Sequence, residues 1–126
     1  MRGITTLLLG AALVLALGAG PATAKDGDVL RAGRCTGATT SKVKLSEENG
    51  RIEVEFEVDQ NRNGVRWTVV LRRSGSRIAR LVRTTRPPSG SFEARVLARN
   101  SAGAETISGR AVSPAGEVCT AWATWR

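Results

Sequence analysis

The stretch KVKLSEENGRIEVEFE, residues 42–57, decides the fold class of this chain. Its centre is Asn49-Gly50, the strongest short-range signal for a β-hairpin with a two-residue turn. Such a turn fixes which residues face each other, and it places the apolar residues of both strands on one face. The apolar cross-strand pairs are Val43 with Phe56 and Leu45 with Val54. We therefore expect an antiparallel hairpin whose apolar face covers a core.

The other face of this hairpin is expected to carry opposite charges directly across from each other. The predicted pairs are Lys44 with Glu55, Lys42 with Glu57, and Glu48 with Arg51. A one-residue slip would destroy the apolar and the charged pattern together. The alternating acids of residues 53–59 could instead form a metal or acid–base site. The facing lysines favour the solvated face of a strand.

The remainder of the chain continues as strands separated by turns. Turn signals recur every ~8–12 residues after residue 33, a spacing typical of an all-β sandwich or barrel, and no stretch after residue 25 has a helical period. Further strands are predicted over residues 65–72, 77–84, 92–98, 107–112 and 118–122. The inward residues of the first of these are Trp67, Val69 and Leu71. The next strand leaves two choices open, Ala79 with Leu81 or Ile78 with Val82.

Residues 1–24 have the pattern of a secretory signal peptide. Arg2 supplies a positive start, residues 4–18 form an uncharged apolar run, and Ala22-Thr23-Ala24 is a small-x-small cleavage site. The alternative is an uncleaved membrane anchor, but the run is shorter than the ~20 residues that cross a bilayer. We expect a secreted, extracellular bacterial protein with a flexible lead, residues 25–32, and one domain, residues 33–126.

The two cysteines, Cys35 and Cys119, lie near the two ends of the predicted mature chain. An even cysteine count in an exported protein predicts a disulfide. Closing a loop of this length stabilises a chain by roughly 4–5 kcal/mol in the chain-entropy model. The alternative is two free thiols that bind a metal. A chain without histidine or a third cysteine offers too few soft ligands for zinc.

Residues 92–103 carry a pattern that is familiar from one fold class. The motif Phe92-x-Ala94-x-Val96-x-Ala98-x-Asn100-x-x-Gly103 resembles the penultimate strand of fibronectin type III and related immunoglobulin-like domains. The resemblance implies an immunoglobulin-like antiparallel β-sandwich of about seven to eight strands. The chain departs from the family where Phe92 replaces the usual corner tyrosine. It also resembles small exported bacterial proteins of unassigned function, and a shared fold implies no activity.

The composition argues against an enzyme. The chain has no histidine and no tyrosine, which removes the commonest general base and every histidine-dependent triad. We therefore expect no catalytic residues, no cofactor and no metal site. One alternative is calcium, because Asp59-x-Asn61-x-Asn63-Gly64 resembles the start of a calcium loop. However, Val70 stands at the twelfth position, where that loop needs an acidic ligand.

The charge of the chain indicates a class of partner. Nineteen basic residues face 11 acidic ones, for a net charge of +8, and the chain between residues 65 and 91 holds no acid. The arginines concentrated there are Arg72, Arg73, Arg77, Arg80, Arg83 and Arg86. We predict that this cluster binds a polyanion, such as an anionic wall polymer or glycan. The alternative is a charged surface that only keeps the protein soluble.

Two further features concern possible partners. Pro87-Pro88 stiffens the corner at residues 86–90, so the alternative function is a secreted interaction or inhibitor domain that presents this loop to another protein. Near the C-terminus, we expect Trp122 to pack near the disulfide and Trp125 to be the more exposed; core or edge packing is favoured, and a binding role is the alternative. The overall expectation is a monomeric, secreted binding or structural module.

Overall fold

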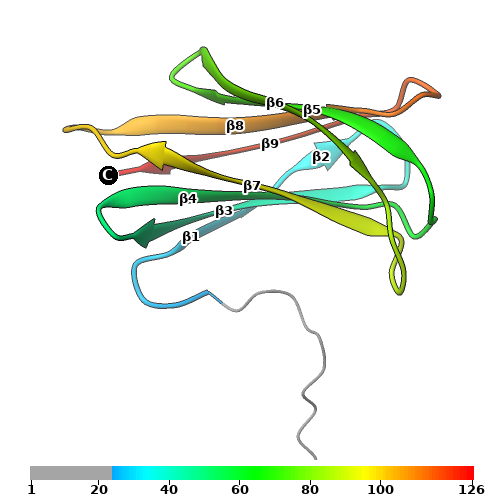
Figure 1. Cartoon of the computed structure of the whole chain (residues 1–126), viewed down its shortest axis with the longest axis horizontal. Helices are drawn as coiled ribbons and strands as arrows, with labels where there is room; N and C mark the ends of the chain where they lie inside the picture. Colours follow the sequence, from blue (N-terminus) through cyan, green and yellow to red (C-terminus); the bar gives the residue numbers. More distant parts are fainter. Residues whose placement is uncertain (1–23) are drawn as a thin grey trace, which may run out of the picture.

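The structure, a computed structural model, describes residues 24–126 and consists of two antiparallel β-sheets, one stacked on the other (Figure 1). The four-stranded sheet, in the order β1-β3-β4-β7, comprises β1 Val29–Ala32, β3 Thr40–Glu48, β4 Arg51–Asp59 and β7 Ser91–Arg99. The five-stranded sheet, in the order β2-β9-β8-β5-β6, comprises β2 Arg34–Cys35, β5 Arg66–Arg73, β6 Ser76–Thr84, β8 Glu105–Val112 and β9 Val118–Trp125. The five-stranded sheet is the upper layer in Figure 1.

The all-β prediction is confirmed, because residues 24–126 form strands and turns without a helix. There are nine strands in this part of the chain, where the sequence suggested seven or eight. The same residues contain no helix that is long and apolar enough to cross a membrane. Apart from Ala24, the predicted signal peptide lies outside the described residues.

The hairpin of β3 and β4 has the predicted register. Val43 lies opposite Phe56, and the pairing continues in step from Thr40 with Asp59 to Glu48 with Arg51. The turn residues Asn49 and Gly50 have φ values of 49° and 80°. Positive φ at both central residues is what a type I′ turn requires, and Asn-Gly supplies it at low cost.

The first strands correct the expected flexible lead of residues 25–32. Strand β1 pairs with β3 over four positions, so residues 29–32 belong to the four-stranded sheet. The chain then crosses at Gly33 to β2, which pairs with β9 in the other sheet. A β-carbon at Gly33 would lie 2.1 Å from the carbonyl oxygen of Thr120, so only glycine fits this crossing.

Strand β6 resolves the open question about its inward residues. Leu81 lies opposite Val69 and Ala79 opposite Leu71, so Ala79 and Leu81 face the core. The register then shifts, because Arg72 lies opposite Arg77 and leaves Ile78 as an extra residue on β6. This one-residue irregularity has the two-against-one pattern of a β-bulge.

The core lies between the two sheets. Its largest fully buried side chains include Trp67 of β5 and Phe56 of β4. The Trp67 indole Nε1 donates a hydrogen bond to Gln60 Oε1 at 3.1 Å, which satisfies the one polar atom of this side chain. Gly109 of β8 lies against the Phe56 ring, where a β-carbon would be 2.6 Å from Cγ. Close contact between the sheets therefore depends on a residue without a side chain at this position.

The predicted disulfide is present between Cys35 of β2 and Cys119 of β9. It joins residues 84 positions apart, and Cys119 is fully buried. The bond holds the two-residue strand β2 against the edge of the five-stranded sheet. Disulfides persist in oxidising compartments, so the bond fits an extracellular setting.

Candidate functional site: an arginine-rich sheet face

The outer face of the five-stranded sheet carries arginines that form no ion pair within the described residues. In β5, Trp67, Val69 and Leu71 point into the core, so the alternate residues point outward. Following the register across the other four strands identifies the outward arginines, all of them exposed: Arg34, Arg66, Arg72, Arg77, Arg80 and Arg110. We call these six residues the cationic face.

Two rows of side chains cross this face perpendicular to the strands. The first row crosses all five strands and consists of Arg34, Thr120, Arg110, Val70 and Arg80. The second row consists of Trp122, Ser108, Arg72 and Arg77. Neighbouring strands lie ~4.8 Å apart, so the arginines of the first row, which occupy alternate strands, are spaced by ~10 Å.

No acidic residue occupies an outward position of these five strands. The ion pairs found within residues 24–126 all involve other cations, so none of them neutralises an arginine of the cationic face. An isolated surface ion pair contributes little to stability. However, six exposed arginines that form no ion pair leave an uncompensated positive field over the sheet.

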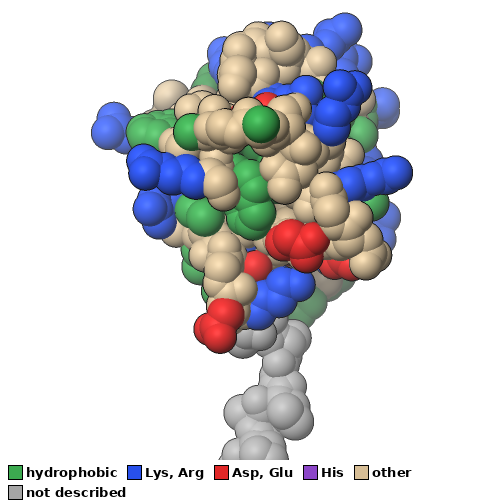
Figure 2. Space-filling model, turned by 90° about the vertical axis from the view of Figure 1, so that its left-hand side faces the viewer, with side chains coloured by type: hydrophobic (Ala, Val, Ile, Leu, Met, Phe, Trp, Pro, Cys, Tyr) green, Lys and Arg blue, Asp and Glu red, His purple; other side chains and the backbone are tan. Residues whose placement is uncertain are grey.

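The acids lie mainly on the outer face of the opposite sheet, namely Glu48, Glu53, Glu55, Glu57, Asp59 and Glu93. They form ion pairs there, including Lys44 Nζ to Glu55 Oε2 at 3.1 Å and Lys42 Nζ to Glu57 Oε1 at 3.3 Å. Figure 2 views the sandwich from one end: Lys and Arg project around the upper part, and Asp and Glu gather mainly below. Five cations, Lys42, Lys44, Arg51, Arg95 and Arg99, share this face with the acids, so it is nearly neutral, whereas the cationic face holds arginines alone.

Two carboxyl groups of the four-stranded sheet have shifted pKa values in opposite directions. Burial would raise the pKa of Glu55, but hydrogen bonds and charge from Lys44 and Arg95 outweigh burial and lower it. Burial and the negative charge of Glu55 raise the pKa of Glu93. Glu93 lies directly opposite Glu57 in the sheet register. Both shifts follow from burial and from the charges of this ion-pair network.

The predicted arginine cluster divides between the two sides of the β5–β6 hairpin. Arg72, Arg77 and Arg80 are exposed on the cationic face. Arg73 points to the other side, where its Nε forms an ion pair with Glu105 Oε1 at 3.2 Å and its Nη1 donates to the Arg99 carbonyl at 2.7 Å.

The last two arginines of the predicted cluster also lie off the cationic face. Arg83 lies opposite Trp67, on the core side of the sheet, and its Nη1 donates to the carbonyl of Val82. Arg86 is exposed in the corner after β6, beyond the sheet. The structure therefore brings three of the six predicted arginines together.

The other half of the cationic face was not predicted. Arg66 could have been found from the sequence, because it has the same strand parity as Arg72 and the opposite parity to Trp67. Arg34 and Arg110 carry no such local signal. They join the first row only because β9 and β8 lie between β2 and β5 in the sheet.

The two C-terminal tryptophans correct the expectation about which is buried. Trp122 is 64% exposed, whereas Trp125 is 9% exposed and belongs to the core. The reason is alternation along β9: Cys119 points inward, so Trp125 does as well, and Trp122 points outward. Trp122 therefore shares the outer face of the sheet with the arginines.

A hollow of about 750 Å³ at the end of β9 is lined by Trp122, Thr124, Arg31 and Arg126 together with the acids Asp26 and Glu47. Two further open hollows lie along the cationic face. One, of about 500 Å³, is lined by Arg34, Thr120 and Trp122, by Gly33 at the crossing and by Arg31 and Ala32 at the end of β1. The other, of about 410 Å³, is lined mainly by Arg66, Val70, Arg110 and the end of β8. The two hollows lie on either side of the β8–β9 pair, so the face is not flat.

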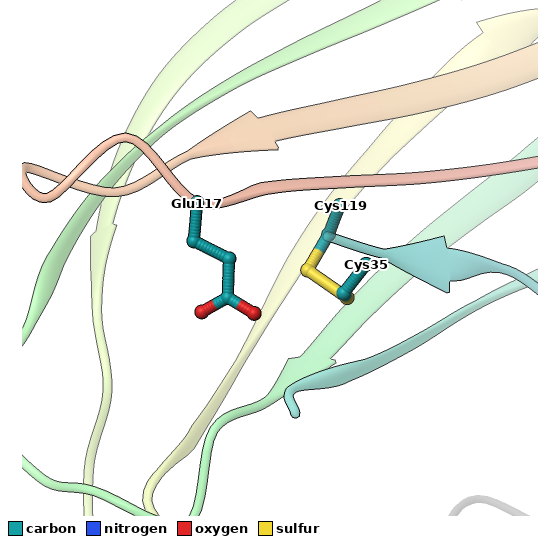
Figure 3. A group of neighbouring side chains, drawn as sticks. All are labelled: Cys35, Glu117 and Cys119. Atoms are coloured by element: carbon teal, nitrogen blue, oxygen red, sulfur yellow. A yellow bond between two sulfur atoms is a disulfide. The ribbon is translucent and has the colours of Figure 1, made fainter. Parts of the chain in front are cut away.

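The disulfide has a carboxylate beside it, which raises the question of a metal site (Figure 3). Glu117 and the two cysteine sulfurs lie within 4.8 Å of one another. The sulfurs are bonded to each other, so they are not thiolate ligands. Glu117 Oε1 accepts a hydrogen bond from Thr39 Oγ1 at 2.8 Å, and Oε2 accepts one from the Thr39 backbone N–H at 3.3 Å. This carboxylate therefore anchors the segment after β2.

The loop of residues 86–90 is held from both sides. The Gly90 N–H donates to the Arg86 carbonyl at 2.8 Å, and the Arg86 N–H donates to the Ser91 carbonyl at 2.9 Å. Gly90 packs closely on the loop of residues 60–65, where a β-carbon would lie 2.1 Å from the backbone nitrogen of Arg62. These hydrogen bonds and this close packing anchor the loop.

Comparison with known proteins gives this chain no relatives. No protein-family model, no curated protein and no solved structure matches it.

Proposed function

We propose that the protein is a secreted, non-enzymatic binding module that holds an anionic polymer on its cationic face. The observation that carries the proposal is the absence of acids from one sheet face. Six exposed arginines share that face without an acidic partner, while the outer face of the opposite sheet mixes six acids with five cations. A ligand with regularly placed negative charges would complement the first face and find a nearly neutral, ion-paired surface on the second.

The chemistry of arginine supports binding rather than catalysis. A guanidinium stays protonated at any physiological pH and presents five N–H donors in a planar fork. That fork matches carboxylate, phosphate and sulfate groups through paired hydrogen bonds. A face whose charged groups are all arginines can hold anions, but it has no group that takes up or releases a proton.

The proposal also places the protein in a cell envelope or outside the cell. We propose in addition that residues 1–24 direct export, and that the fold belongs to the immunoglobulin-like class. The buried disulfide supports the first part. The two stacked antiparallel sheets support the second, although β7, which carries the buried Phe92, is followed by two strands and is not the penultimate strand of the resemblance. The anchored loop of residues 86–90 offers a second mode, contact with one secreted protein.

Binding to inorganic polyphosphate, measured over a series of salt concentrations, tests the proposal. The Arg72→Gln, Arg77→Gln, Arg80→Gln triple variant should bind at least about tenfold more weakly. The slope of the logarithm of the binding constant against the logarithm of the salt concentration should also be shallower by about two to three. Each lost phosphate contact removes roughly one from this slope. Folding should be unaffected, since the three side chains are exposed.

A matched control variant is Arg51→Gln, Arg62→Gln, Arg99→Gln. It removes the same three charges at exposed positions away from the cationic face. It should retain most of the affinity and the salt slope. Equal losses in both variants, or no polyphosphate binding at low ionic strength, would overturn the proposal. Salt-tolerant, one-to-one binding to a single protein from culture medium would instead favour the loop of residues 86–90.

A further inference from the structure

Trp122 is a large exposed apolar side chain on the same outer face of the sheet as the arginines, and the charge of that face does not account for its exposure. The chain has five aromatic residues, and four of them, Trp67, Phe56, Phe92 and Trp125, are buried in the core. Trp122 is 64% exposed at the start of the second row. Leaving an indole in water forgoes the free energy of burying it. An exposed tryptophan beside charged groups is therefore a candidate contact for a ligand.

We propose that the anionic polymer is an acidic polysaccharide, and that one of its sugar rings stacks on Trp122 while its acid groups bind the arginines. This inference rests on the function proposed above and specifies its ligand. The indole provides a flat apolar surface for the C–H face of a sugar ring. Hydroxyl groups for the sugar's own hydroxyls lie next to it, on Ser108, Thr120 and Thr124.

The spacing of the first-row arginines supports a polymer of low charge density, whereas Arg72 and Arg77 of the second row lie on neighbouring strands and are closer together. Along the first row Arg34, Arg110 and Arg80 are separated by strands that contribute Thr120 and Val70. The resulting ~10 Å interval suits a chain in which charged sugars alternate with neutral ones. A nucleic acid strand in a duplex carries one charge per ~3.4 Å, which is far denser than this row.

The number of exposed aromatic residues also favours a polysaccharide over single-stranded nucleic acid. Surfaces that bind single strands stack successive bases on several aromatic side chains. Among the described residues, this protein exposes Trp122 alone for that purpose. The hollow of about 500 Å³ beside Trp122, which Arg34 also lines, offers one place where a ring and an acid group can bind together.

The test compares Trp122→Ala with the wild-type protein on three probes. These are hyaluronan, which alternates a uronic acid with a neutral sugar, inorganic polyphosphate, which has no sugar, and single-stranded oligothymidylate. The substitution should weaken hyaluronan binding about three- to tenfold and change polyphosphate binding by less than about twofold. Trp122→Phe should recover part of the loss, because it restores an aromatic ring.

The matched control is Leu97→Ala, which removes an exposed apolar side chain, 50% accessible, from the opposite sheet. It should leave the binding of all three probes unchanged. Hyaluronan should also change the fluorescence of the wild-type protein but not that of Trp122→Ala, because the other two tryptophans are buried.

The outcomes separate this inference from the function on which it rests. If polyphosphate binds and Trp122→Ala leaves hyaluronan binding unchanged, the sugar contact is wrong while the anion-binding face stands. A loss for oligothymidylate as large as that for hyaluronan would mean that Trp122 stacks on bases, which also overturns the inference. If none of the three probes binds at low ionic strength, the proposed function itself is wrong.

Discussion

Arg72 lies directly opposite Arg77 across the β5–β6 hairpin, and both side chains leave the same face of the sheet. Like charges in direct cross-strand positions destabilise a sheet. Because neither arginine forms an ion pair within the described residues, the fold gains nothing evident from this arrangement. This cost is compatible with the proposed binding role, although Arg51 and Arg99 form the same kind of like-charge pair on the opposite sheet.

We therefore predict that Arg77→Glu makes the protein more stable and a poorer ligand for polyanions. Replacing a like-charge pair by an opposite-charge pair should raise the free energy of unfolding by about 0.2–1 kcal/mol. Urea unfolding measures the stability, and polyphosphate titration measures the binding. Arg62→Glu, the same charge change in an exposed loop, is the control. A loss of stability in Arg77→Glu would show that the two arginines do not oppose each other.

On the opposite sheet, Glu93 should limit stability at neutral pH. Burial and the charge of Glu55 raise its pKa, and Glu57 lies directly opposite. A carboxyl whose pKa is higher in the folded than in the unfolded state destabilises the fold when it is ionised. Glu93→Gln should therefore stabilise the protein at pH 7 by about 0.2–1 kcal/mol.

The pH dependence of this effect provides its check. The gain from Glu93→Gln should shrink as the pH falls through the raised pKa, because the wild-type carboxyl then becomes neutral as well. Urea unfolding of both proteins at a series of pH values measures the difference. The exposed Asp26→Asn serves as the control and should show no such trend. A gain that grows with falling pH would have the wrong sign for this explanation.

The sequence predicted the centre of the fold because the information there is local. Asn49-Gly50 sets the turn, the turn sets the register, and the register pairs Lys44 with Glu55 as observed. The disulfide could be predicted as well, since an exported chain with two cysteines has one possible pairing. Trp122 could have been placed correctly too, because an odd separation from Cys119 puts them on opposite faces of a strand.

The complete cationic face could not be predicted, because it depends on the order of strands that are distant in the sequence. Arg34 and Arg80 lie at opposite edges of the five-stranded sheet and share a row only through β9, β8 and β5. No turn signal specifies that order. The bulge at Ile78 is a further obstacle, since one extra residue reverses which side chains of β6 point outward.

The ion pair of Lys44 and Glu55 has a third member, Arg95. Reversing the two charges of the pair should reveal its contribution to stability. Lys44→Glu would place a second carboxylate beside Glu55, which is only 5% exposed, and should cost about 1–3 kcal/mol. Adding Glu55→Lys should recover only part of the loss. The new lysine would face Arg95, whose Nη2 lies 3.3 Å from Glu55 Oε1.

The neighbouring pair of Lys42 and Glu57 provides the matched comparison. There the swap Lys42→Glu with Glu57→Lys should recover the full loss, because the new lysine would face Glu93 instead of an arginine. Double-mutant cycles based on urea unfolding measure both recoveries. Full recovery at Lys44 and Glu55 would contradict the three-residue arrangement.

Gly109 tests how closely the two sheets pack. A β-carbon there would lie 2.6 Å from Cγ of the Phe56 ring, too close for an unstrained contact, although its backbone has no positive φ. Gly109→Ala should therefore destabilise the protein by about 1–3 kcal/mol through overpacking, even though alanine is the less flexible residue. Ser108→Ala, one position away on the outer face, should have little effect.

A second substitution at Phe56 distinguishes overpacking from a general intolerance of alanine in β8. Phe56→Leu alone should destabilise the core, because a smaller side chain leaves a cavity. In the Gly109→Ala background the same change should cost less, since the space left by the ring admits the new methyl group. The coupling should amount to about 0.5–3 kcal/mol in a double-mutant cycle measured by urea unfolding. Additive losses would mean that Gly109 is required for some reason other than its contact with Phe56.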